Sequence, residues 1–137
     1  NIKFMDVLPE THLLGILKYC SYGIVVLHKN HKTHNIPGKY LTYLRSKLPI
    51  FAAVNKGNDI INEINLNNVG IAIENLERKV ILDNILKLPE RTKKTYVRMQ
   101  RNCKILFLKK YKSDKAASII LDRFFKHDNE RSSFNKS

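Results

Sequence analysis

Features that would place the chain outside the ordinary globular class are missing from its 137 residues. No apolar run approaches the roughly 20 residues that span a bilayer, and the first residues contain no apolar core of a signal peptide. Because the chain does not begin with methionine, we expect it to be a piece of a longer protein. Apolar residues make up 43% and charged residues 27% of the sequence, which indicates one globular domain.

Cysteine is also scarce. Cys20 and Cys103 are the only two, and their spacing matches no metal or redox motif. Both lie in apolar sequence surroundings, so we expect two reduced, buried thiols and a cytoplasmic protein. Peripheral attachment to the inner membrane is left open.

Acidic residues are few, with 12 Asp and Glu against 25 Lys and Arg, so the net charge is +13. Between Lys87 and Lys126 there are 13 basic and 3 acidic residues, a net charge of +10. Such a basic segment favours binding to a polyanion. The candidates are nucleic acid, an anionic membrane surface and phosphate groups. Nucleic acid is the less favoured partner, because no nucleic-acid motif occurs and few aromatic residues interrupt the polar face. The alternative is that these basic residues form a solvated face that binds no polyanion.

The first half of the chain alternates apolar runs with helical patterns. The apolar runs predict strands at residues 2–7, 23–28, 49–54 and 69–73, and the patterns between them predict helices at 10–20, 38–47 and 60–66. Asn58 or Asp59 is the expected cap of the last of these helices. This alternation predicts an α/β fold, a partial Rossmann-like parallel sheet with flanking helices.

The second half reads as a helical extension. Helices are expected at residues 76–88, ended by Pro89, and at 92–111, with Tyr96, Met99, Cys103, Leu106 and Lys110 on one stripe. A last helix capped by Ser113 and a frayed tail at residues 127–137 complete the prediction.

Two loops are candidates for a ligand site, because ligands of open parallel sheets bind at the carboxyl ends of the strands. They are residues 28–39 and 55–59. The first carries Pro37, Gly38 and Lys39 at a helix start, where free N–H groups, the helix dipole and a lysine suit a phosphate. The plainer alternative is a loop and a helix start without a ligand.

The segment at residues 37–50, PGKYLTYLRSKLPI, resembles the donor-site helix of the GT-B glycosyltransferases of family 4. Their pattern there is roughly Pro-Ser-Lys-x-x-Glu-Tyr-x-x-x-Gly-x-Pro-Val. Lys47 stands where the family has glycine, and the family's pair of glutamates falls on His34 and Thr42. Further similarity is found at residues 4–9, 13–17, 20–23, 55–61, 68–73 and 111–117, so the resemblance covers residues 2 to about 126.

The resemblance implies the donor-binding part of an enzyme that moves a sugar from a nucleotide-sugar to a glycan or lipid-linked acceptor in bacterial surface polysaccharide synthesis. It implies βα units at residues 1–75 and a helical extension at 76–126 of a GT-B C-terminal domain, with the N-terminal acceptor domain missing. The chain alone is therefore expected to be inactive. No metal or other cofactor is implied, and no catalytic residue is carried over. The implied donor-binding residues are His34, Asn35, Ile36, Pro37, Gly38, Lys39 and Thr42.

Other interpretations are weaker or of another class. His28, His31 and His34 lie three residues apart, which is not a zinc-binding spacing, and Glu74 and Glu77 read as a solvated face rather than an acid–base pair. The second function class is a non-catalytic basic protein that binds nucleic acid or an anionic membrane. A half-sheet also leaves an open strand edge, from which we expect self-association.

Overall fold

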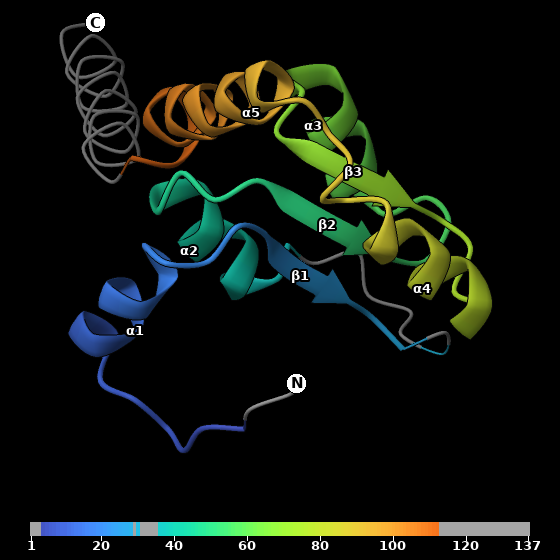
Figure 1. Cartoon of the computed structure of the whole chain (residues 1–137), viewed down its shortest axis with the longest axis horizontal. Coiled ribbons are helices and arrows are strands. Elements are labelled where there is room, and N and C mark those ends of the chain that lie inside the picture. The colour runs from blue at the N-terminus through green and yellow to red at the C-terminus, as the bar shows by residue number, and fades with distance from the viewer. Residues whose placement is uncertain (1–3, 29, 31–35, 113–137) are drawn as a thin grey trace, which may run out of the picture.

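Three parallel strands form the centre of the computed structural model, which describes residues 4–28, 30 and 36–112 (Figure 1). They are β1 (Gly23–Val26), β2 (Ile50–Ala53) and β3 (Gly70–Ile73), and they lie side by side in chain order. Their register aligns the first residue of each strand. The α/β class and the small parallel sheet are thereby confirmed.

Helices cover both faces of this sheet (Figure 1). The helices are α1 (Glu10–Leu17), α2 (Gly38–Arg45), α3 (Asp59–Asn67), α4 (Arg78–Leu86) and α5 (Lys93–Leu106), and a π-helical turn, η1 (Phe107–Tyr111), continues α5. Side chains of α2, α3 and α5 pack on one face of the sheet, while α4 packs on the other. None of the helices in the described ranges is long and apolar enough to cross a bilayer.

The core follows from the alternation of side chains along the strands. In the middle strand β2 every side chain is buried, because helices cover both of its faces. Ile50 and Ala52 face α2, α3 and α5, whereas Phe51 and Ala53 face α4. Among the described residues only one face of β1 is covered, so its Val25 is buried while Ile24 and Val26 are exposed.

Local capping bonds define two helix starts that the sequence indicates. The buried Asn58 accepts a hydrogen bond from the Ile60 N–H at 3.2 Å, so Asn58 rather than Asp59 caps α3. The hydroxyl oxygen of Thr92 accepts from the Thr95 N–H at 3.3 Å and caps α5. Asn68 ends α3 in the left-handed conformation, with φ 50°, which asparagine tolerates better than most residues.

Several predicted elements differ from the structure. Residues 4–7 form no strand, and Val7 is fully exposed; in the described residues no neighbouring strand lies beside this apolar run to accept its hydrogen bonds. The first helix ends at Leu17 instead of residue 20, and the helix expected at residue 76 begins at Arg78. The helix expected from Ser113 and the tail at residues 127–137 lie outside the described residues.

Strand β1 is an edge strand in the described part of the chain, where it pairs with β2 alone. Tyr43 partly covers its outer side: the Tyr43 ring lies where a side chain on Gly23 would be, and its hydroxyl donates to the Ile24 carbonyl at 3.5 Å. Self-association through this edge stays a prediction.

Candidate functional site

The loops that follow the three strands meet at one edge of the sheet, as the parallel arrangement requires. His28 follows β1, and Asn55 follows β2. The Asn55 side-chain amide donates to the His28 carbonyl at 3.3 Å, which ties the first two loops together. We call this region the carboxyl edge.

A hollow of about 700 Å³ opens at the carboxyl edge between the loops after β2 and β3. The Asn75 side-chain oxygen accepts from the Glu77 N–H at 2.8 Å and shapes the chain's entry into α4. The residues that line the hollow are Asn55, Lys56, Glu74, Asn75, Leu76 and Glu77. The hollow therefore combines a cation, carboxylates and amides.

Sequence reasoning places only part of this hollow. It singles out the loop at residues 55–59 because that loop follows a buried strand. It treats Glu74 and Glu77 as a solvated face, and both are indeed exposed, but they border the hollow. The usable signal was their position directly after β3, which ends at the same edge.

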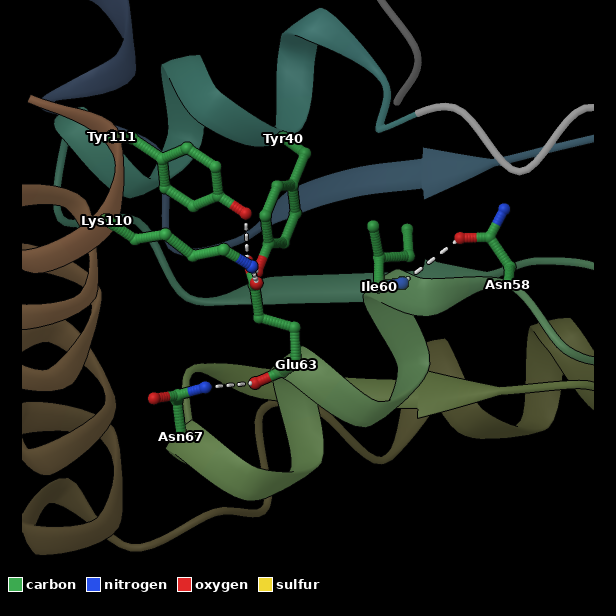
Figure 2. Close-up of polar contacts among 7 residues, drawn as sticks. All are labelled: Tyr40, Asn58, Ile60, Glu63, Asn67, Lys110 and Tyr111. Carbon is green, nitrogen blue, oxygen red and sulfur yellow. Dashed lines mark hydrogen bonds and ion pairs between the residues drawn. The ribbon is translucent and has the colours of Figure 1, made fainter. Parts of the chain in front are cut away.

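The N-terminal turn of α2 begins after β1 at the same edge, and Figure 2 shows this helix starting beside the end of β1. Pro37 precedes the helix and provides no side-chain cap. Gly38 and Lys39 are exposed residues of the first turn, where backbone N–H groups have no partner within the helix, so these N–H groups can bind a ligand. Thr42 donates its hydroxyl to the Gly38 carbonyl at 3.3 Å and thus lies against this turn.

The structure describes five of the seven residues that are predicted to bind the donor. Ile36 and Pro37 lie directly before α2, Gly38 and Lys39 lie in its first turn, and Thr42 lies one turn further on. His34 and Asn35 lie outside the described residues, as does His31 of the histidine series. His28 Nδ1 accepts a hydrogen bond from the Asn30 N–H at 3.2 Å. Within the described ranges no group of three metal-ligating side chains is found.

A largely buried carboxylate forms a second polar cluster, which sequence reasoning missed (Figure 2). The Glu63 side chain on α3 is 10% exposed and accepts hydrogen bonds from the hydroxyls of Tyr40 at 2.9 Å and Tyr111 at 2.5 Å. Lys110 of η1 forms an ion pair with it. Three segments, α2, α3 and η1, therefore meet at one carboxylate.

The electrostatics of this cluster favour an ionised Glu63. Burial acts to raise the pKa of its carboxyl, but the hydrogen bonds from Lys110, Tyr111 and Tyr40 outweigh burial and hold that pKa below its ordinary value. Burial and the bond to Glu63 raise the pKa of Tyr111 to about 12. An ionised carboxylate with three donors on it is a poor general base, so we interpret the cluster as an anchor for η1. Its sequence signal was a carboxylate at position 63 beside Ile60 and Ile64 of the buried stripe.

The two cysteines differ in exposure. Cys103 is buried as expected, and its thiol donates to the carbonyls of Val69 at 3.5 Å and Leu48 at 3.6 Å. Burial raises the pKa of this thiol to about 12. The prediction of a buried Cys20 is wrong: Cys20 is exposed, because α1 ends at Leu17 and Cys20 follows in a turn instead of on the helix face.

We therefore expect one fast-reacting thiol in the folded protein. An aromatic disulfide reagent at neutral pH should modify Cys20 quickly and Cys103 only on unfolding, because a thiolate must be exposed to attack. Cys20→Ser should abolish the fast phase, and Cys103→Ser should leave it unchanged. Two fast phases in native buffer would contradict the burial of Cys103.

The fold defines this chain as an α/β protein with a three-stranded parallel sheet and a polar carboxyl edge. No model of a known protein family matches the sequence, and no curated protein or solved structure matches it significantly. The resemblance to family 4 glycosyltransferases therefore stays a prediction from the order and spacing of motifs.

Proposed function

We propose that the carboxyl edge binds the diphosphate of a nucleotide-sugar, and that the chain is the donor-binding part of a glycosyltransferase. The observation that carries the proposal is the α2 N-terminal turn, where Gly38 and Lys39 are exposed at the edge that carries the polar hollow. The glycan or lipid-linked acceptor and the second domain belong to the parent enzyme in this proposal.

Three helices, α2, α3 and α4, start at this edge, and they differ in their capacity for an anion. Helix α4 is preceded by Glu74 and Glu77, whose negative charges disfavour an anion beside its first turn. In helix α3 the Asn58 side chain already accepts from the Ile60 N–H, and Asp59 lies in the first turn. Helix α2 has no acidic residue in its first turn and has Lys39 there instead. A diphosphate is thus favoured at α2, where the helix dipole and the lysine charge act together.

A second observation agrees with the family pattern. Lys47, which stands where the family has glycine, has a left-handed backbone with φ 57°. Glycine adopts this conformation without steric cost. The backbone at position 47 therefore has the conformation that suits the glycine of the family pattern. This supports the assignment of residues 37–50 to the donor-site helix.

The proposed chemistry follows from these groups. The N–H groups of Gly38 and Lys39 and the Lys39 ammonium would stabilise the negative charge on the leaving nucleoside diphosphate. Carboxylates and amides such as Glu74 and Asn75 would accept hydrogen bonds from sugar hydroxyls across the hollow. Thr42 would contribute to ribose binding by exchanging its bond to the Gly38 carbonyl for one to the ligand.

An NMR titration of the ¹⁵N-labelled chain with UDP, GDP and their sugars tests the proposal. We expect amide shifts at residues 36–42, and Lys39→Ala should weaken binding about tenfold or more, since a charged hydrogen bond is worth about 1.5–3 kcal/mol. Lys18→Ala, an exposed lysine between α1 and β1 and away from the carboxyl edge, is the control and should leave the shifts unchanged. An unchanged affinity in Lys39→Ala, or no amide shifts with any nucleotide, would overturn the proposal.

A further inference from the structure

The outward side of α5 and η1 presents cations and aliphatic side chains together. Lys94, Val97, Arg101, Ile105 and Leu108 follow one another at intervals of three or four residues, so they lie on one side of the helix. The three apolar members are exposed at 52% for Val97, 49% for Ile105 and 46% for Leu108. We call this surface the α5 basic face; its members are Lys93, Lys94, Val97, Arg98, Arg101, Lys104, Ile105 and Leu108.

The opposite side of the same helix is firmly held. Met99, Cys103 and Leu106 are buried in the core, and Tyr96 donates its hydroxyl to the Ser21 carbonyl at 2.8 Å. Lys110, one turn beyond Leu106, points inward to Glu63 (Figure 2). In the described part of the chain the α5 basic face is therefore the side of the helix left to solvent, and α5 runs along one edge of this part (Figure 1).

Its positive charge is not compensated within the described residues. The sequence contains no acidic residue between Arg91 and Lys112. The ion pairs in the described part of the chain are Arg45–Glu10 and Lys110–Glu63, and neither involves a cation of the α5 basic face. The face therefore carries five positive charges without a carboxylate partner among the described residues.

We propose that the α5 basic face binds the surface of an anionic lipid membrane. Cations attract acidic headgroups, and aliphatic side chains between them can enter the boundary between headgroups and acyl chains. Long lysine and arginine stems can cover that boundary while their charges stay in the headgroup layer. A nucleic-acid surface would instead place aromatic rings for stacking, and the exposed members of this face include no aromatic residue.

Two triple variants separate charge from insertion in a vesicle-flotation assay. The vesicles are phosphatidylcholine with or without phosphatidylglycerol. Removing the charges of Lys94, Arg98 and Arg101 by glutamine should weaken binding to the anionic vesicles on the order of a hundredfold, since each surface cation contributes about a factor of five. Replacing Val97, Ile105 and Leu108 by serine should weaken it about tenfold or more. The control variant replaces Lys18, Lys79 and Lys87 by glutamine, which removes the same number of charges elsewhere on the surface. It should bind nearly as well as the native chain.

The chain contains no tryptophan, so the fluorescence of a single introduced tryptophan reports membrane insertion at its own position. Leu108→Trp should shift its emission to shorter wavelength on phosphatidylglycerol vesicles and be quenched by lipids brominated on their acyl chains. Leu86→Trp, exposed on α4 across the sheet, should show neither effect. Circular dichroism of every variant checks that it is folded.

Three results would overturn the proposal. They are no binding to anionic vesicles at low salt, equal binding by the serine variant, and an unshifted Trp at position 108. Tight, steeply salt-dependent binding to duplex DNA that the serine variant retains would assign the face to nucleic acid instead. These readouts do not depend on nucleotide binding at α2, so either proposal can fail alone.

Discussion

Gly70→Ala should remove a large share of the protein's stability. A Cβ atom at position 70 would lie 1.9 Å from the Ile50 carbonyl oxygen and 2.7 Å from the Ile50 backbone nitrogen and carbonyl carbon. These are backbone atoms of β2, which cannot rotate aside as a side chain would, so β3 has to move away from its partner. We expect a loss of about 3 kcal/mol or more in the free energy of unfolding, out of a total of about 5–15 kcal/mol for a typical domain.

Urea unfolding followed by circular dichroism measures this loss. Gly15→Ala in α1 is the matched control, because a Cβ there meets nothing within 4 Å. That variant should gain about 0.5–1 kcal/mol, since alanine favours a helix more than glycine does. An unchanged unfolding midpoint for Gly70→Ala would contradict the close pairing of β2 and β3.

Glu63→Gln should lower stability at neutral pH and remove an acid-dependent part of it. The folded protein holds the pKa of Glu63 below the ordinary value of 4.5, so the unfolded chain binds this proton more readily. The stabilisation is therefore fully present above about pH 4.5 and is lost as the pH falls through the folded pKa. At pH 7 we expect a loss of about 2–3 kcal/mol, because the buried Tyr40 hydroxyl and the Lys110 ammonium lose a charged acceptor.

The measurement is the free energy of unfolding of the native chain and the variant, from pH 7 down to about pH 3. The gap between them should narrow as the pH falls. Glu90→Gln, an exposed residue after α4, should differ from the native chain by less than about 0.5 kcal/mol throughout. A gap that stays constant with pH would show that Glu63 is not held as a carboxylate in the folded protein.

Three features were determined by the sequence itself, and each depends on residues close together in the chain. The buried run at residues 49–54 became the middle strand β2, because its side chains are apolar on both faces. Asn58 and Thr92 cap α3 and α5 through bonds to N–H groups two or three residues away. The buried stripe of α5 follows from helical periodicity alone.

The tertiary structure decided what depends on residues far apart. Residues 4–7 have strand-like composition but form no strand, because strand formation needs a partner edge as well as propensity. Glu63 meets Tyr40, Lys110 and Tyr111 from 23, 47 and 48 positions away, a convergence that no local pattern encodes. The hollow at the carboxyl edge likewise exists because parallel pairing brings the ends of β2 and β3 together. Local chemistry thus set the middle strand and the starts of α3 and α5, and packing set which side chains share a site.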